Sequence, residues 1–391
     1  MRLLALAAAL AALAAGLYLG GHPGDLPRPV RDTFVEEPTA VHSQAADIIQ
    51  DNYAKKVPDD LLENGSLKGM VQALHDRFSH YFTPHENRLF EESIGGEFSG
   101  VGMTVIQHPR GLEVTSVFRR SPAASAKIEP GNLITAVNGK SIAGQSSDVS
   151  TARIKGKPGT FVTLTVVKRP GNKRRVVRIK RATIKVPVVQ ARLRRAEGRR
   201  FGVVRLSSFT NGVHAQVRAN LLRLLGKRPA GLVLDLRQNG GGLLEEAVLV
   251  ASLFVPDGVI VTTKGRTRPE QVLRATGGSI ARQPLVVLVD RGTASAAEIV
   301  TAALRERLGA NVVGRRTFGK GVFGQLFDLK NGGAIDLTLG NYYTPKGHNL
   351  AGKGITPDVT AQDDPKTSRD EALQQALRVL AGEVGGRAGR P

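Results

Sequence analysis

Hydrophobic residues follow three different spacings along the 391-residue chain. Over residues 41–94 they recur at helical intervals, as Leu67 and Val71 do, which predicts a helical region. Over residues 95–183 short β-branched runs alternate with glycines, which is typical of a small β-rich domain. Over residues 184–362 apolar runs alternate with amphipathic segments, which predicts strands joined by crossover helices. The expected fold class is therefore α/β, in a multidomain (α+β) chain.

Local signals predict where several elements begin. Thr83, Pro84 and Glu86 form the pattern of a helix N-terminus, with a capping residue, a proline and an acid in order. The strands predicted in the β-rich domain are 103–106, 112–117, 133–137 and 162–167. Those predicted at the start of the α/β core are 201–206, 231–236 and 284–290. The terminal region 363–391 is expected to hold a helix over 368–380 and a frayed Gly/Arg-rich tail.

The first 24 residues contain an uncharged apolar run that follows Arg2. A positive residue followed by leucines and alanines is the pattern of an export signal, and about 20 apolar residues also suffice to cross a bilayer. Residues 1–24 are therefore predicted to be a cleaved signal peptide or a retained membrane anchor, and the Pro-rich residues 25–40 a linker. The protein is expected to be exported, and either periplasmic (extracytoplasmic) or anchored to the membrane.

Composition excludes several kinds of site. The chain has no cysteine, which excludes disulfides, thiolate nucleophiles and cysteine–zinc sites, and we expect no metal or cofactor. Aromatic residues make up only 5%, too few for the stacking platforms of sequence-tolerant nucleic-acid binders, so no nucleic-acid partner is expected. The net charge of +21 favours contact with anionic membrane or cell-envelope surfaces. Much of this charge lies in residues 168–200, where interleaved valines and isoleucines predict strands with one solvated basic face.

Two predicted strand-to-helix turns carry candidate chemistry, because function in open α/β sheets concentrates where strands end and helices begin. The turn 235–242 ends in three glycines, whose backbone N–H groups can approach a ligand closely. The turn 292–298 places Ser295 at a helix N-terminus, where free N–H groups favour developing negative charge. Ser295 is thus a candidate nucleophile. The alternative is that Ser295 and Glu298 only form a capping box, which is the commoner role of such a serine.

A serine nucleophile also needs a base. Only His214 and His348 lie in the α/β region, and neither lies in a turn that suggests a Ser-His-Asp arrangement. Lys320 lies between two glycines at the entrance of a predicted strand and is the remaining candidate. A lysine acts as a base only when it is neutral, which requires burial away from water. The alternative is a solvated lysine in a surface turn.

The β-rich domain resembles a bacterial PDZ module. The resemblance rests on the glycine loop Phe98-Ser99-Gly100-Val101-Gly102 and on the block that runs from Ser121-Pro122-Ala123-Ala124 to Asn138-Gly139. It implies that a peptide adds to the sheet edge as an extra strand. Its terminal carboxylate would then bind the backbone N–H groups around Gly100, Val101 and Gly102.

The core contains two blocks, GTASAAEI at 292–299 and TFGKG at 317–321, that resemble the carboxyl-terminal processing proteases, which are tail-specific serine–lysine peptidases. Three further blocks match that family: DLR at 235–237, NYYTP at 341–345 and GKGITPD at 352–358. The resemblance implies a crotonase/Clp-protease-like core with an inserted PDZ module. It implies Ser295 as nucleophile, Lys320 as general base, and the backbone N–H groups of Gly241 and Ala296 as the oxyanion hole.

A third catalytic residue follows from the same resemblance. In that family a glutamine four residues after the lysine orients it, but here Gly324 holds that position and the glutamine is Gln325. One extra residue turns a strand side chain to the other face unless a bulge absorbs it. Gln325 is therefore assigned the orienting role on condition that a bulge forms at Gly324.

The predicted function is a serine-type endopeptidase of the cell envelope that binds the C-terminal tail of protein substrates through its PDZ domain and cleaves through a Ser-Lys acyl-enzyme. The expected partners are proteins or peptides with free C-termini, with a homo-oligomer as a further option. One alternative, favoured by the displaced glutamine, is a catalytically inactive PDZ peptide-binding protein or envelope chaperone. Another is an anionic-polymer binder that uses residues 168–200, whose affinity would fall steeply with salt.

Overall fold

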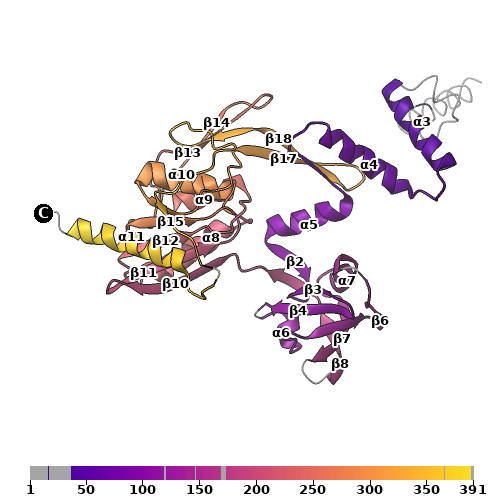
Figure 1. Cartoon of the computed structure of the whole chain (residues 1–391), viewed down its shortest axis with the longest axis horizontal. Helices are drawn as coiled ribbons and strands as arrows, with labels where there is room; N and C mark the ends of the chain where they lie inside the picture. The colour runs from indigo at the N-terminus through magenta and orange to yellow at the C-terminus, as the bar shows by residue number, and fades with distance from the viewer. Residues whose placement is uncertain are drawn as a thin grey trace, which may run out of the picture. The chain divides into compact units, whose positions relative to one another are not determined.

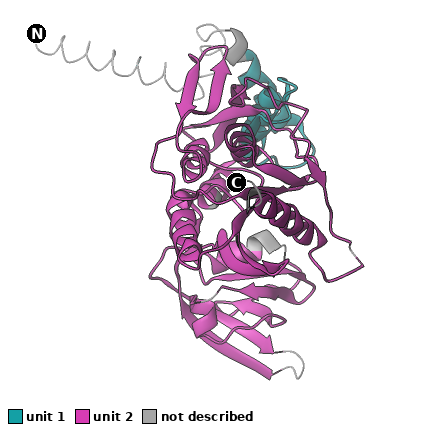
Figure 2. Cartoon of the chain, turned by 90° about the vertical axis from the view of Figure 1, so that its left-hand side faces the viewer, with its two compact units in different colours: residues 1–81 teal, residues 82–391 magenta. Residues whose placement is uncertain are grey.

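A computed structural model describes Gly16 and residues 37–118, 120–145, 147–168, 173–364 and 366–388. The chain divides into two compact units, residues 1–81 and 82–391, drawn in teal and magenta in Figure 2. The expected signal peptide or anchor lies outside the described residues apart from Gly16. Among the helices that the structure describes, none has both the length and the apolar composition that a membrane span requires.

The first unit is helical, as the spacing of its apolar residues predicts. It contains α3 (Glu37–Asn52) and α4 (Asp59–Gln72), and β1 (His80–Phe82) begins at its end. Helix α3 starts within the segment expected to be a linker. The side chain of Tyr81 is buried, and its hydroxyl donates to Asn64 Oδ1 at 2.6 Å. This hydrogen bond ties the end of the unit to α4.

The β-rich domain is built around an antiparallel sheet in the order β3-β4-β5-β7-β8, with β6 paired to β5 (Figure 1). Its elements are β3 (Met103–His108), β4 (Gly111–Val117), α6 (Pro122–Ser125), β5 (Leu133–Val137), β6 (Lys140–Ser141), α7 (Ser147–Ile154), β7 (Phe161–Lys168) and β8 (Lys173–Lys180). The domain has a hydrophobic core of its own, in which Leu112, Ile134 and Leu164 are fully buried. The predicted strands are therefore confirmed as parts of one small domain.

Two strands join this domain to the rest of its unit. Helix α5 (Pro84–Gly95) leads into β2 (Glu97–Gly100), which pairs antiparallel with the returning β9 (Ala182–Lys185). The predicted start of α5 is confirmed, because Thr83 N–H donates to the Glu86 carboxylate at 2.9 Å and Glu86 N–H donates back to Thr83 Oγ1 at 3.3 Å. The chain thus enters and leaves the β-rich domain through neighbouring strands.

The α/β core is built on a second six-stranded sheet, in the order β10-β11-β12-β15-β16-β19. Its strands are β10 (Val189–Ala196), β11 (Arg199–Leu206), β12 (Gly231–Asp235), β15 (Leu285–Val289), β16 (Asn311–Gly314) and β19 (Val359–Thr360). Neighbours from β11 to β19 are parallel, and β10 is antiparallel to β11. Every residue of β12 and β15 is buried, because helices cover both faces of the sheet, and this explains their continuous apolar sequences.

Four helices cover this sheet. Helices α8 (Val213–Leu225), α9 (Leu244–Ser252) and α10 (Ala296–Leu308) share one core cluster with one face of the sheet, and α11 (Glu371–Ala388) packs on the opposite face. The prediction that the last helix ends near Leu380 is wrong, because α11 continues to Ala388. Leu380 and Ala381 are buried, and Glu383 accepts a hydrogen bond from the Asn311 side chain at 2.6 Å. These contacts stabilise the glycine-containing end of the helix, where the intrinsic tendency to form a helix is low.

An antiparallel sheet lies beside the α10 side of the core. It contains β13 (Val259–Gly265), β14 (Gln271–Arg274), β17 (Val322–Asp328) and β18 (Ala334–Tyr343), with β18 pairing with both β13 and β17. Helix α10 packs against β13. Strand β18 therefore ends near the N-terminus of α10, where the candidate nucleophile lies.

Candidate active site

Ser295 lies at the turn between β15 and α10 in a backbone conformation that is unusual for a residue with a side chain. Its φ is 56° and its ψ −122°, outside the regions that L-residues ordinarily adopt. Its backbone N–H donates to Glu298 Oε2 at 3.0 Å, and the expected capping box between these two residues is present. Its hydroxyl also lies 2.8 Å from the hydroxyl of Tyr342. Ser295 therefore takes part both in the cap of α10 and in a hydrogen bond to β18.

The glycine-rich turn after β12 packs directly against Ser295. A Cβ added to Gly241 would lie 2.7 Å from Ser295 Cβ and 3.1 Å from Ala296 N, and the φ of Gly241 is +105°. Only glycine fits this position. The Gly241 N–H donates to Asn239 Oδ1 at 2.9 Å, and the buried Asn239 side chain also donates to the carbonyl of Leu206 at 2.9 Å. The structure thus places Gly241 and Ala296 beside the candidate nucleophile, with the Gly241 N–H bonded to Asn239.

Lys320 and Ser295 are connected through the buried carboxylate of Glu298. The N–H of Lys320 donates to Glu298 Oε2 at 2.9 Å, the same oxygen that accepts from Ser295 N–H. Glu298 Oε1 accepts from Gly319 N–H at 2.8 Å and from the hydroxyl of Thr317. The Glu298 side chain is completely buried. One carboxylate therefore binds the backbone on both sides of the candidate serine–lysine pair, although the two residues lie far apart in the sequence.

All the residues predicted for catalysis line one cavity of about 720 Å³. They are Ser295, Lys320, Gln325, Gly241 and Ala296. The cavity has a mixed wall, because polar groups such as Glu245 and Arg268 alternate with apolar residues. Among the residues that the structure describes, no group of three or more His, Asp or Glu side chains could hold a metal ion. The cavity brings together a hydroxyl, an amine and backbone N–H groups.

The strand that carries Gln325 has the irregularity that the sequence suggested, but the extra residue lies on the partner strand. Phe323 pairs with Gly340 and Gly324 with Thr338, which leaves Leu339 of β18 without a partner in the register. Gln325 is exposed, and its Oε1 accepts from the Arg268 guanidinium at 2.8 Å. The structure thus brings Gln325 into the cavity of Lys320 with its amide oxygen bound to Arg268.

Tyr342 is a site residue that the sequence analysis did not single out. It lies near the end of β18, its side chain is 4% exposed, and its hydroxyl is the hydrogen-bond partner of Ser295. Burial raises the pKa of Tyr342 well above its ordinary value, and the nearby Glu298 carboxylate acts in the same direction. Tyr342 therefore stays a neutral phenol that holds the serine hydroxyl. Its only sequence signal was its place in the NYYTP block.

Arg237 fixes the start of the glycine-rich turn to the C-terminal helix. Its guanidinium binds Asp235 Oδ1 and Oδ2 at 2.9 and 2.8 Å and Asp370 at 2.8 and 3.0 Å, and it also reaches Asp363 at 3.1 Å. Burial alone would lower the pKa of Arg237, but its hydrogen bonds to Asp235 and Asp370 outweigh burial and raise it. The turn that carries Gly241 is thus connected through a buried cation to residues just before α11.

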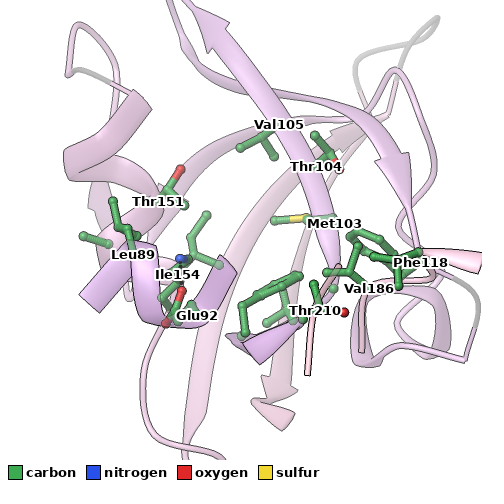
Figure 3. A pocket seen from close by; sticks show the side chains of 18 of the residues that line it. Leu89, Glu92, Met103, Thr104, Val105, Phe118, Thr151, Ile154, Val186 and Thr210 are labelled. Atoms are coloured by element: carbon green, nitrogen blue, oxygen red, sulfur yellow. Dashed lines mark hydrogen bonds and ion pairs between the residues drawn. The ribbon is translucent and has the colours of Figure 1, made fainter. Parts of the chain in front are cut away.

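The predicted PDZ residues line a second cavity, of about 620 Å³, shown in Figure 3. Gly100, Val101 and Gly102 lie on its wall together with residues of β3 and α7. Gly102 has a φ of +82°, and a Cβ there would lie 2.3 Å from the Cβ of Ser121. The close approach of the loop to Ser121 therefore requires glycine at this position.

Comparison with known proteins connects these two cavities to known domains. Residues 200–361 match the model of peptidase family S41, and residues 89–167 match the PDZ domain model. The core of the chain is an S41 peptidase domain. Residues 32–85 match the N-terminal domain model of the activating protease CtpB. The predicted fold class is confirmed: an α/β S41 core, an inserted PDZ domain and a helical N-terminal region.

Relatives of the chain include a probable CtpA-like serine protease of Staphylococcus aureus (strain N315), 36% identical over 322 residues that cover 82% of the chain. The corresponding Staphylococcus epidermidis protein is 33% identical over 79% of the chain. The chain spans 64% of the length of the first relative and 62% of the second.

Among solved structures, a photosystem II D1 C-terminal processing protease aligns with a TM-score of 0.52 and 28% identity, over 90% of this chain and 99% of its own. A putative S41 protease from Bacteroides fragilis NCTC 9343 has a TM-score of 0.53 and 18% identity, over 87% and 96% of the two chains. At 18% identity, the second comparison shows a similarity of fold alone.

Proposed function

We propose that this protein is a serine endopeptidase that uses Ser295 as nucleophile and Lys320 as general base. The observation that carries the proposal is that both residues and the two expected oxyanion donors, Gly241 and Ala296, line one cavity. The four hydrogen bonds of the Glu298 carboxylate support it further, because they bind the backbone of both the serine and the lysine segments.

In the proposed reaction the scissile carbonyl of the substrate lies next to Ser295. The neutral amine of Lys320 takes the hydroxyl proton while the Ser295 oxygen bonds to the carbonyl carbon, and the carbonyl electron pair moves to oxygen. The N–H of Ala296 stabilises this oxyanion by a hydrogen bond. The N–H of Gly241 does the same after it has broken its hydrogen bond to Asn239. Collapse breaks the C–N bond, and the leaving amine takes the proton from Lys320. Water then adds to the acyl carbon while Lys320 takes a proton from it. Lys320 returns that proton to the Ser295 oxygen as the ester bond breaks.

The hydroxyl of Ser295 changes its hydrogen-bond partner during this cycle. In the structure that partner is Tyr342, and the first step requires the proton to be directed to Lys320 instead. We propose that Gln325 orients the lysine at that stage, which requires its amide to leave Arg268. The reactive arrangement proposed here therefore differs from the resting one in the hydrogen bonds of Ser295 and Gln325.

The proposed substrates are proteins with accessible C-terminal tails, which the PDZ cavity binds before the catalytic cavity cleaves them. The proposed location is the cell envelope, because the apolar run after Arg2 is the pattern of an export signal. A phosphatase that is active only outside the cytoplasm, fused after the N-terminal segment, measures export directly. The solvent-facing Arg174, Arg178 and Lys180 of β8 agree with the predicted basic face and give an anionic envelope surface a place to bind.

The decisive experiment compares the wild type with Ser295→Ala and Lys320→Ala on an unfolded protein that ends in an apolar C-terminal tag. Cleavage should disappear in both variants, whereas Ser295→Ala should still bind the tag. Lys330→Ala, which removes an exposed lysine in the turn between β17 and β18, is the matched control and should cleave normally. If the wild type binds the tag without ever cleaving it, the protein is a peptide-binding module and the endopeptidase proposal fails.

A further inference from the structure

Tyr342 of β18 contacts both parts of the proposed serine–lysine pair. Its backbone N–H donates at 3.0 Å to the carbonyl of Gly321, the residue that follows Lys320. Its hydroxyl oxygen lies 2.8 Å from Ser295 Oγ. The side chain is buried, and it lines the cavity that contains Ser295 and Lys320. Tyr342 is therefore bound to the segment that carries the lysine, while its hydroxyl reaches the serine.

The direction of the bond between the two hydroxyls depends on where the Ser295 proton points. A serine hydroxyl has one proton to donate and two lone pairs that accept. Either hydroxyl can be the donor in the structure, but once Ser295 directs its proton to Lys320, its oxygen can only accept from Tyr342. Burial raises the pKa of Tyr342, so the phenol keeps the proton that this bond requires. The reactive serine thus has a neutral donor directly beside Oγ.

Negative charge on Ser295 Oγ needs such a donor because of its surroundings. The carboxylate of Glu298 lies close enough to act on the Tyr342 phenol, and its charge also opposes a second negative charge at the serine. The backbone N–H of Ser295 already donates to Glu298, and that of Gly241 donates to Asn239. A preorganised donor aimed at developing charge in a buried site stabilises a transition state strongly. The Tyr342 hydroxyl already lies at hydrogen-bond distance from Oγ.

We propose that Tyr342 is a catalytic residue that donates a hydrogen bond to Ser295 Oγ while negative charge develops on that oxygen. In acylation the bond strengthens as the serine proton passes to Lys320 and Oγ bonds to the carbonyl carbon. In deacylation it strengthens again as the bond between Oγ and the acyl carbon breaks, until Lys320 returns the proton. The phenol keeps its own proton throughout, so the exchange of protons among Ser295, Lys320 and the leaving amine is unchanged. This inference rests on the proposed function, because it needs Ser295 to act as the nucleophile.

Replacement of Tyr342 by phenylalanine removes the donor and keeps the ring. With an internally quenched peptide as substrate, Tyr342→Phe should lower kcat about thirtyfold, which corresponds to ~2 kcal/mol for a hydrogen bond to a charged group. KM should stay within about twofold of the wild-type value, because the bond strengthens only in the transition state. Tyr343→Phe is the matched control. It makes the same change at the next residue of β18, whose side chain points to the opposite face of the strand, and it should keep the wild-type kcat.

A fluorophosphonate probe tests the serine without a peptide. Ser295 Oγ bonds to phosphorus, fluoride leaves and Lys320 takes the serine proton, so the same charge develops on Oγ. Labelling of Tyr342→Phe should be slower by a factor similar to the fall in kcat, and Tyr343→Phe should be labelled at the wild-type rate. Urea denaturation shows whether each variant is folded.

Incorporation of 3-fluorotyrosine at position 342 tests the hydrogen bond while the shape of the side chain hardly changes. Fluorine makes the phenol a stronger acid and a stronger donor, and burial keeps it protonated at neutral pH. The bond is charge-assisted only in the transition state, so kcat and the labelling rate should both rise about twofold. A side chain that only packs against the serine would leave both rates unchanged, as should 3-fluorotyrosine at position 343.

Unchanged kcat and labelling in folded Tyr342→Phe would overturn this inference and leave the endopeptidase proposal intact, as would a fluorinated protein that is no faster than the wild type. If Tyr342→Phe does not fold, the fluorinated protein decides alone. If the wild type is labelled but cleaves no peptide, the endopeptidase proposal fails and the labelling rates still decide the role of Tyr342. If the wild type neither cleaves peptide nor reacts with the probe, both proposals fail.

Discussion

Replacement of Glu298 by glutamine tests whether one buried carboxylate sets the positions of the serine and the lysine. The carboxylate accepts from the N–H groups of Ser295, Gly319 and Lys320 and from the hydroxyl of Thr317. Glutamine has one carbonyl oxygen, which can accept two of these bonds, and it directs an NH2 group at the other two donors. Each buried donor without an acceptor costs about 1–3 kcal/mol, so the free energy of unfolding should fall by about 2–6 kcal/mol.

The loss of activity should exceed what this destabilisation explains. The bonds that are lost hold the backbone of both residues of the proposed serine–lysine pair, and a misplacement of about 1 Å lowers a rate by about a hundredfold. We therefore expect kcat/KM for a fluorogenic peptide to fall by at least that factor under conditions where the variant is folded. Urea denaturation measures the stability of the same preparation and confirms that it is folded.

Glu246→Gln is the matched control for this experiment. Glu246 is also buried and accepts from two backbone N–H groups, those of Gly212 at 2.7 Å and His214 at 2.9 Å, but these belong to the start of α8. It should lose stability to a similar degree and keep near-normal kcat/KM once folded. If folded Glu298→Gln keeps the wild-type kcat/KM, or if Glu246→Gln loses as much activity, the positioning argument is refuted.

Three further predictions follow from other contacts of the site. Burial raises the pKa of Tyr342, so above pH ~10 the phenol loses its proton more readily in the unfolded chain than in the folded one. The free energy of unfolding of the wild type, measured by urea denaturation, should therefore fall by up to ~1.4 kcal/mol per pH unit relative to that of Tyr342→Phe. The same pH dependence in both proteins would contradict this. Burial opposes ionisation of Asp370, but hydrogen bonds to Arg237 and a backbone N–H lower its pKa below the ordinary value. Asp370→Asn should therefore be about 1–2 kcal/mol less stable at neutral pH, with the difference shrinking as pH falls below ~4; a constant difference would show that the charge is not responsible. Gln325→Ala should lower kcat about tenfold, which corresponds to the loss of one hydrogen bond of ~1.4 kcal/mol. Arg268→Ala should leave kcat unchanged. If both variants lose the same amount of kcat, the hydrogen bond between Gln325 and Arg268 is the important contact instead.

The elements that the sequence predicts best are those with strong local patterns. The apolar runs of β12 and β15, the capping residues of α5 and the serine at the start of α10 are all readable within a few neighbouring residues. The meeting of Ser295 with the glycine-rich turn also follows, because carboxyl ends of neighbouring parallel strands lie at one edge of a sheet.

The contacts that sequence could not predict depend on pairings distant in the chain. The capping-box pattern predicts the bond from Ser295 N–H to Glu298, but the other donors to Glu298 come from residues 317–320 and become visible only in the fold. Tyr342 reaches Ser295 from a different sheet. The extra residue near Gln325 lies on β18 because strand register is decided by both partners and cannot be read from one.

The bond network of Arg237 has a consequence for the order in which the site is completed during synthesis. The arginine that supports the glycine-rich turn is neutralised by Asp363 and Asp370, more than a hundred residues later, and the helix that follows them covers the sheet below. A growing polypeptide therefore carries Ser295 before it carries the acids and the helix that brace the loop opposite it. The glycine-rich turn acquires this support only after residue 370 has been added.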